Sequence, residues 1–100
     1  MVMKGEHRCH NRLTVVGLAS ELSRFERTHW QVALKARYLE PLELSKNRLA
    51  WQFETNLPPV LMRLSKRHPK LTFLLEYDGD RRKGLVKAHD GQIEHHQVSY

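Results

Sequence analysis

The segment from Trp51 to Tyr77 constrains the fold of this chain most, because it carries the signals for a strand, a helix with both of its ends, and a second strand. At its start, Leu49, Trp51 and Phe53 alternate with smaller or polar residues. Alternation with a period of two is typical of a strand with one buried face. The pattern therefore predicts a half-buried strand over residues 47–54.

Prolines mark the two ends of the helix in this segment. Pro58 and Pro59 suit the first turn, where a missing N–H costs nothing, and Pro69 ends the helix at His68. The apolar residues expected to form its buried stripe are Val60, Leu61 and Leu64. A second alternation then predicts a strand over residues 71–77. The aromatic residues of both strands are expected in the core: Trp51, Phe53, Phe73 and Tyr77.

The N-terminal half shows a similar order of elements. Residues 1–10 have no periodic pattern and predict an irregular arm. The β-branched run in residues 12–17 predicts a strand, and Ser20 is expected to cap the helix that follows. Three residues would share the buried face of that helix: Leu22, Phe25 and His29. Residues 36–46 fit either a short edge strand or a loop, because Pro41 cannot donate to a sheet ladder.

The end of the chain predicts a β-hairpin over residues 82–98, preceded by a turn at residues 78–80. Asp90-Gly91 is the strongest short-range signal for a two-residue type I′ turn. Counting outward from it pairs Lys87 with Glu94, which would form a cross-strand ion pair. The other pairs given by this count are His89 with Gln92, Ala88 with Ile93, and Val86 with His95.

Together these elements predict a single domain over residues 1–100 with the order β-α-(β)-β-α-β-β-β. The apolar content of 40% is enough for one modest core. Two right-handed crossovers that place both helices on one face of an antiparallel sheet define a ferredoxin-like two-layer α+β sandwich. The C-terminal hairpin would extend this sheet at one edge.

The composition indicates the cellular compartment of the protein and the kind of partner it could bind. No apolar run approaches the roughly 20 residues of a membrane span, and the first residues lack the apolar region of a secretory signal. Cys9 is the single cysteine, which fits a reducing compartment, so we expect a cytosolic protein without membrane association. The net charge of +6, from 17 Lys and Arg against 11 Asp and Glu, favours a negatively charged partner such as nucleic acid or an acidic protein surface.

Two parts of the chain carry a family pattern. The first is Cys9-x-Asn11-x-Leu13-x-Val15-x-Gly17; the second is Phe53-Glu-Thr-Asn-Leu-Pro-Pro-Val60, then Leu64-Ser and His68-Pro-x-Leu-Thr-Phe-x-Leu-Glu-Tyr77. In this order they resemble the Api92-like proteins, small proteins with a ferredoxin-like domain encoded by bacteriophages, plasmids and integrated elements. The chain has Asn56-Leu57 where that family has Ser before its paired prolines. The resemblance implies a mobile genetic element and the cytosol of a bacterial host, and it supplies no catalytic residues.

The histidines and the cysteine do not form a metal-binding or catalytic motif. His7, Cys9 and His10 are close in sequence, but no paired zinc ligands such as Cys-x-x-Cys accompany them. His95 and His96 are neighbours on one strand, so their side chains would point to opposite faces of the sheet. Cys9 is expected to be a small buried residue, since no nucleophile elbow or glycine-rich loop accompanies it. We predict no enzyme activity, no metal and no cofactor.

Basic residues form two candidate binding groups. The first, on the second helix and at its C-terminal end, consists of Arg63, Lys66, Arg67 and Lys70, with His68 among them. The second, at the start of the hairpin, consists of Arg81, Arg82 and Lys83. Several cations on one face could contact phosphates, whereas separate ones form an ordinary solvated surface. An RRM site is not expected, because residues 47–53 lack the glycines of its motif and Thr14 stands where its second aromatic belongs.

The residues and the resemblance predict a non-catalytic docking protein of a phage or plasmid that interferes with host nucleic-acid or defence machinery. An anti-CRISPR or anti-restriction inhibitor is the concrete form of this hypothesis. Its partner would be a host protein or ribonucleoprotein complex, because a net positive charge argues against mimicry of DNA. The alternative is a module that binds single-stranded RNA or DNA without sequence specificity. In either case the chain would be a monomer or a homodimer through the edge strand at residues 92–98.

Overall fold

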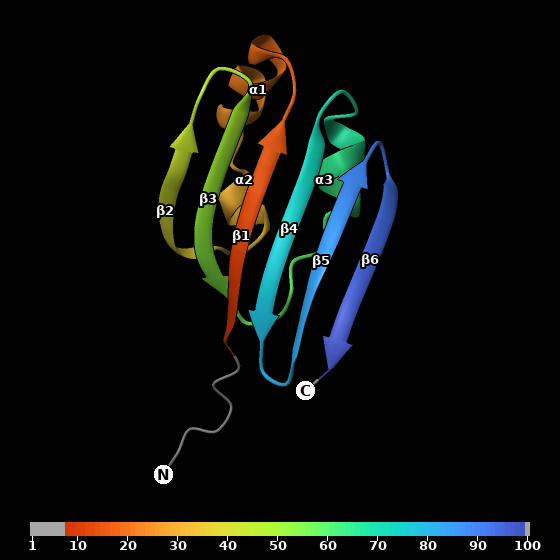
Figure 1. Cartoon of the computed structure of the whole chain (residues 1–100). Helices are drawn as coiled ribbons and strands as arrows, with labels where there is room; N and C mark the ends of the chain where they lie inside the picture. Colours follow the sequence, from red (N-terminus) through yellow and green to blue (C-terminus); the bar gives the residue numbers. More distant parts are fainter. Residues whose placement is uncertain (1–7, 100) are drawn as a thin grey trace.

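The computed structural model describes residues 8–99, which form one antiparallel sheet of six strands with short helices (Figure 1). The elements are β1 (Cys9–Val16), α1 (Ala19–Glu26), α2 (Trp30–Ala33), β2 (Arg37–Leu44), β3 (Arg48–Thr55), α3 (Met62–Arg67), β4 (Thr72–Gly79), β5 (Arg82–His89) and β6 (Gln92–Ser99). β1 begins at Cys9, so residues 9 and 10 of the predicted irregular arm belong to a strand; residues 1–7 lie outside the described part of the chain.

The strand order is β2-β3-β1-β4-β5-β6, and all neighbours are antiparallel. Two crossovers pass over a strand: β1 connects through α1 and α2 to β2, with β3 between them, and β3 connects through α3 to β4, with β1 between them. The α+β class and the antiparallel sheet are therefore confirmed. The open sheet of six strands is not the four-stranded βαββαβ arrangement of a ferredoxin.

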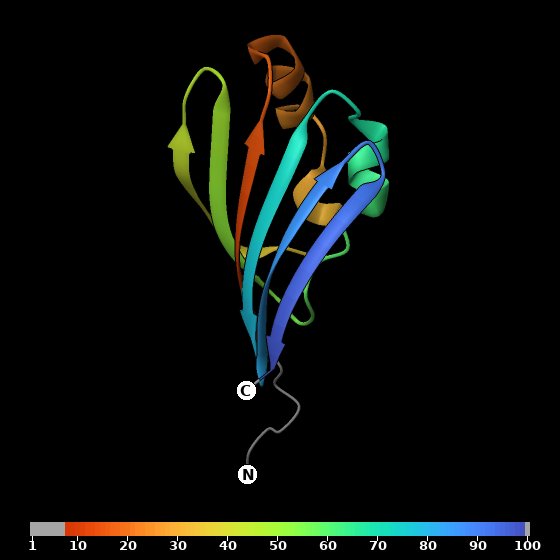
Figure 2. The same ribbon diagram turned by 45° about the vertical axis from the view of Figure 1, so that its right-hand side comes forward.

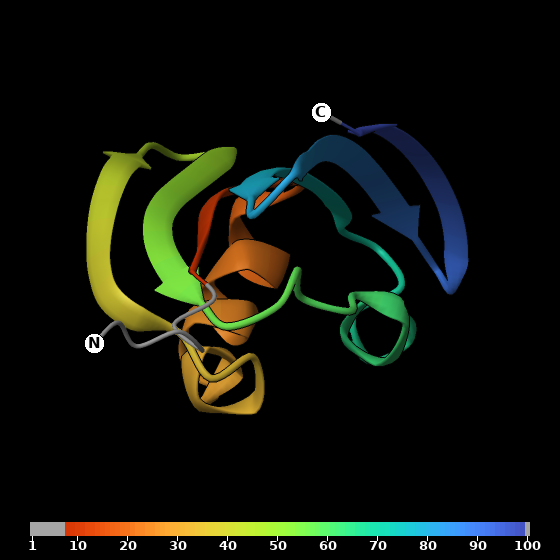
Figure 3. The ribbon, with the colours of Figure 1, turned by 90° about the horizontal axis from the view of Figure 1, so that it is seen from below.

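The helices all lie on one face of the sheet, which curves around them and leaves its other face open (Figures 2 and 3). This arrangement was predicted, but the first crossover contains two helices instead of one. α1 ends at Glu26, and α2 begins after a break at Thr28 and His29. We call the two faces of the sheet the helix side and the open side.

The core lies between the sheet and the helices and is centred on Phe25 of α1, which has no exposed surface. Its ring centroid lies 5.5 Å from that of Trp30, 6.1 Å from Trp51 and 5.5 Å from Phe73. The four strand aromatics expected in the core are all buried. On the first crossover, Trp30 is buried and the predicted His29 is exposed, because the chain turns between α1 and α2 and does not continue the helical period.

The C-terminal hairpin has the predicted register in every pair that was counted from its turn, including Lys87 opposite Glu94. Asp90 and Gly91 have φ values of +51° and +81°, as a type I′ turn requires. The hairpin extends the sheet, and β6 is one of its two edges. The other edge is β2, so residues 37–44 form a strand, and its irregular pairing accommodates Pro41.

Three local predictions are wrong. The N-cap of α1 is Leu18, without a side-chain hydrogen bond, so Ser20 lies inside the helix. α3 begins at Met62, after the paired prolines, and Val60 is 78% exposed. The β4–β5 turn is formed by Asp80 and Arg81, because Gly79 still pairs with Arg82 in the ladder.

Candidate partner-binding surfaces

α3 is held in place from two sides. On its buried side, Leu61 and Leu64 join the core. Toward the hairpin, the Ser65 hydroxyl accepts a hydrogen bond from the Gly91 N–H at 2.9 Å and donates one to the Met62 carbonyl oxygen at 2.9 Å. The helix is therefore fixed against the β5–β6 turn, and its remaining surface faces solvent.

That remaining surface carries the first predicted basic group. Arg63, Lys66, Arg67 and Lys70 are all exposed. Residues 56–71 contain no acidic side chain, and in the part of the chain that the structure describes none of the four cations forms an ion pair. Lys66 also packs its aliphatic stem against the turn, since a Cβ on Gly91 would lie 2.8 Å from Lys66 Cε.

α1 adds a cation that the sequence analysis did not assign. Arg24 is exposed and close enough to α3 to act electrostatically on His68 at its C-terminal end. No local pattern in the sequence links Arg24 to this segment, because only the fold brings α1 to the end of α3, through the contact between Phe25 and His68. We define the basic helix surface as the following set: Arg24, Arg63, Lys66, Arg67 and Lys70.

His68 does not belong to this surface, although it was placed among the basic residues. It is buried, and its ring packs edge-on against Phe25 with 5.2 Å between centroids. Its Nε2 has no hydrogen-bond partner among the described residues. Burial lowers the pKa of His68 below its ordinary value; Arg67 and Arg24 lower it further, and Glu21 opposes them. The imidazole is therefore a neutral core group.

Replacing His68 by leucine is expected to reduce the loss of stability in acid. Because the folded-state pKa of His68 is lowered, its neutral form contributes fully above the unfolded-state pKa, and this contribution falls as the pH drops below that value. H68L should therefore gain stability relative to the wild type between about pH 7 and about pH 5. Urea unfolding of both proteins at each pH measures the difference. A constant difference across this range would contradict a buried neutral imidazole.

The second predicted basic group is divided by the sheet. Arg81 occupies the β4–β5 turn with φ +72°. Arg82 pairs with Gly79, which places it on the helix side, whereas Lys83 pairs with Asp78 on the open side. All three are exposed, but they do not form one surface.

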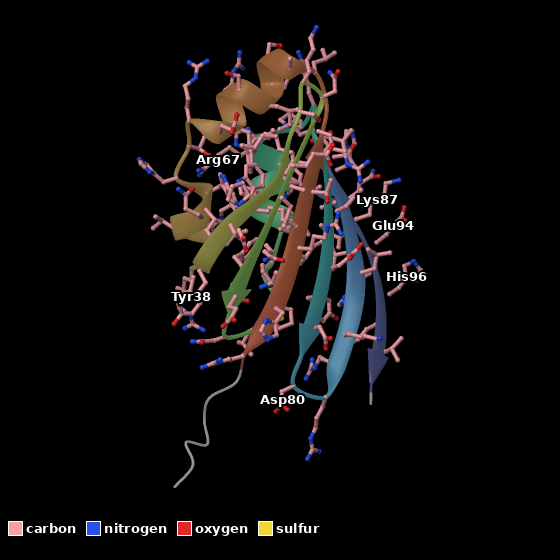
Figure 4. The ribbon with its side chains drawn as sticks, turned by 60° about the vertical axis from the view of Figure 1, so that its left-hand side comes forward. Tyr38, Arg67, Asp80, Lys87, Glu94 and His96 are labelled. Atoms are coloured by element: carbon pink, nitrogen blue, oxygen red, sulfur yellow. The ribbon has the colours of Figure 1, made fainter. Side chains whose placement is uncertain are left out.

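The two basic groups lie at opposite ends of the sheet. The end of β4 beside α3 pairs Thr72 with His89, and the other end pairs Gly79 with Arg82. Strands of this length span about 25 Å. Figure 4 shows Arg67 on the helix side of the upper half and Asp80 at the lower tip. A single compact ligand site would therefore include one of the groups and not both.

The open side carries a shallow groove of about 780 Å³ that crosses all six strands. Its charged side chains are four carboxylates and two cations: Glu40, Glu54, Glu76, Asp78, Arg12 and Lys83. On the central strands β1 and β4, the residues facing this groove are polar, such as Arg12 opposite Glu76. The aromatic rings of the described strands β1, β3 and β4 lie on the buried side. The exposed aromatic of this face is Tyr38 of the edge strand β2, which lines the groove and is 77% exposed, whereas an RRM stacks bases on aromatics of its sheet surface.

Cys9 is buried, as expected, and burial raises the pKa of its thiol. Its Sγ lies 3.5 Å from Asn11 Oδ1, and the Asn11 amide donates to Thr55 Oγ1 at 2.9 Å. This polar cluster joins β1 to β3. A buried thiol with a raised pKa is a poor nucleophile.

Among residues 8–99 no group of three potential metal ligands occurs. His95 and His96 point to opposite faces, as predicted: His95 Nε2 lies 2.7 Å from the buried Tyr77 hydroxyl, and His96 lines the open groove. His7, which is close to Cys9 in sequence, lies outside the described residues.

The described residues thus define a small α+β domain with a basic helix surface on one side and a groove with mixed, mainly acidic charge on the other. Comparison of the chain with known protein families, with curated proteins and with solved structures finds no match. In the described part of the chain, every helix is too short to cross a membrane.

Proposed function

We propose that this chain is a non-catalytic docking protein that binds a negatively charged macromolecule through its basic helix surface. The observation that supports this proposal most is the position of Arg63 and Arg67 on α3, which is anchored to the core and to the hairpin turn, with Lys70 exposed in the turn that follows the helix. Cations held on a rigid element and free of internal ion pairs keep their charge available for a partner. The surface is made of arginine and lysine side chains without a cysteine or a carboxylate among them, a composition that suits electrostatic binding.

The partner class we propose is a host protein or ribonucleoprotein complex with an acidic or phosphate-rich surface. The Api92-like pattern supports a phage or plasmid setting, and with it the role of an inhibitor of host nucleic-acid or defence machinery. It also supports a ferredoxin-like relationship for the four strands β2-β3-β1-β4, with β5 and β6 as an added hairpin. The positive helix surface suits an inhibitor that covers an anionic site, in contrast to one that imitates DNA.

Reversing two charges on the basic helix surface is expected to weaken partner binding about tenfold or more, since each removes a favourable contact and adds a repulsive one. The variant is R63E/R67E. The matched control is R81E/R82E, which reverses the same number of arginines at the other end of the sheet. Tagged wild-type protein and both variants are used to capture partners from nuclease-treated bacterial lysate, and the retained protein is quantified by mass spectrometry.

The proposal requires a stoichiometric partner that R81E/R82E retains and R63E/R67E loses. Absence of such a partner, or equal loss in both variants, would overturn it. The alternative of direct binding to single-stranded nucleic acid is tested by a gel shift with labelled RNA and single-stranded DNA at two salt concentrations. Direct phosphate contacts predict a shift at low salt that declines steeply with added salt and is lost in R63E/R67E.

A further inference from the structure

The two edges of the sheet differ in how they are protected against pairing with another strand. β2 pairs with β3 irregularly, with register shifts between Arg37 and Glu40 and between Pro41 and Glu43. Tyr38 in this strand has φ +56°. Bulges, a proline and charged side chains are the usual means by which natural edge strands avoid unwanted pairing. β2 has all of these features.

β6 has almost none of them. It pairs with β5 over eight consecutive residues without a bulge, from Gln92 opposite His89 to Ser99 opposite Arg82. Residues 92–98 contain no proline, no lysine and no arginine, and Glu94 is their single carboxylate. All seven residues are exposed, and they include the apolar side chains of Ile93 and Val98. This is a regular strand edge of the kind that accepts another strand.

The hairpin geometry decides which backbone groups are free on this edge. In an antiparallel pair, residues alternate between those that exchange hydrogen bonds with the partner strand and those whose backbone groups point away from it. In a two-residue hairpin the residues next to the turn form a hydrogen-bonded pair, here His89 and Gln92. Alternate residues of β6 therefore direct their backbone N–H and C=O outward: Ile93, His95 and Gln97.

We propose that β6 pairs antiparallel with β6 of a second copy of this chain, with His95 opposite His95 of that copy. A two-fold axis perpendicular to the sheet makes the same edge meet itself, and opposite residues then lie on the same face. When the two-fold axis passes beside His95, Glu94 lies opposite the second copy's His96 on the open side, and this favourable pair occurs twice. An axis beside Glu94 would instead place two carboxylates opposite each other. Figure 4 shows Lys87, Glu94 and His96 projecting from the same face of the hairpin.

In this dimer both helix sides face the same direction, so two basic helix surfaces are presented to one partner. A partner with two anionic sites would then bind more tightly than to a single copy. The dimer itself rests on the β6 edge and not on the proposed function, and its test requires no partner.

The experiment measures the mass of the untagged protein in solution, by analytical ultracentrifugation over a concentration series. The wild type should show a monomer–dimer equilibrium. E94K and H96E should each weaken the homodimer about tenfold: by symmetry H96E opposes two carboxylates twice, and E94K replaces both Glu94–His96 pairs by a lysine opposite a histidine. Mixing E94K with H96E should restore the dimer, since the introduced lysine then faces the introduced glutamate across the interface, and the second pair keeps Glu94 opposite His96. Thermal unfolding by circular dichroism checks that each variant is folded.

Gln97→Pro provides a second test of the dimer that does not depend on charge. It removes an outward N–H and leaves the β5 ladder intact, so the folded protein should become monomeric. A wild type that stays monomeric at its highest soluble concentration would overturn the proposal. So would a dimer that neither Q97P nor the charge variants weaken, or single variants whose mixture fails to recover the dimer. Binding of a β-strand from a different protein would appear as a monomeric chain that gains mass only with that protein added, which also contradicts self-pairing.

Discussion

Replacing Phe25 by alanine is expected to destabilise the domain by about 3–5 kcal/mol, the range for truncating a large core aromatic. The ring has no exposed surface and lies between Trp30, Trp51, Phe73 and His68 at centroid distances of 5.2–6.1 Å. It joins α1 to the sheet and to the end of α3. Its loss leaves a cavity whose walls belong to several elements, so no single shift can fill it.

Urea unfolding followed by tryptophan fluorescence measures this loss, because Trp30 and Trp51 both lie next to the ring. Small domains have a total unfolding free energy of about 5–15 kcal/mol, so F25A should retain little stability. F25L is the matched control, because leucine keeps most of the side-chain volume. Apart from the lost aromatic contacts, its free energy of unfolding should fall by about 1.5 kcal/mol or less. An F25A protein within about 1 kcal/mol of the wild type would show that the aromatic cluster is not the centre of the core.

The parts of the fold that the sequence predicted well depend on local chemistry. The register of the hairpin follows from Asp90-Gly91 alone, since two residues that accept positive φ fix the turn and the turn fixes every pair beyond it. Alternation similarly identifies Trp51 and Phe73 as buried, because a strand with one covered face allows no other pattern.

The parts that were predicted incorrectly depend on contacts that the local sequence does not contain. Val60 follows two prolines and has the right spacing for a helix, but it is Leu61 that enters the core, and α3 starts one residue later. Ser20 is a good cap by residue type, yet the exit from β1 places Leu18 at the N-cap position. In both cases the position of the sheet decides where the helix begins.

In the candidate site, too, features that depend on local sequence were predicted and features that depend on distant contacts were not. Four members of the first basic group are exposed, as expected, because they lie on or directly after one short helix, whereas His68 is buried against Phe25. The second group was inferred from proximity in sequence, but adjacent strand residues face opposite sides, which separates Arg82 from Lys83. Arg24 and the mainly acidic groove of the open side were not predicted, because both are formed by elements that are distant in the chain.

Gly84 of β5 is closely surrounded by side-chain and backbone atoms. It lies opposite Tyr77, whose ring covers it and reaches across to His95 of β6, with 2.7 Å between the Tyr77 hydroxyl and His95 Nε2. A Cβ at Gly84 would lie 2.5 Å from the Tyr77 hydroxyl oxygen and 2.7 Å from the His96 carbonyl oxygen. The second of these atoms belongs to the backbone of β6, so a change of side-chain rotamer alone cannot relieve the overlap.

Gly84→Ala should therefore destabilise the domain by about 1–3 kcal/mol, as overpacking in a core does, and should displace the Tyr77 ring from His95. Gly79→Ala is the matched control, because a Cβ there would meet its nearest atom, Cys9 Sγ, at an ordinary contact distance of 3.6 Å. Urea unfolding of both variants measures the difference in stability. A second comparison uses Tyr77→Ala: in that background G84A should cost less, since part of the overlap is gone, while the overlap with the β6 backbone persists. Equal losses for G84A and G79A would mean that the two glycines serve only the flexibility of their strands, and that the Tyr77 ring does not fix the pairing of β4, β5 and β6.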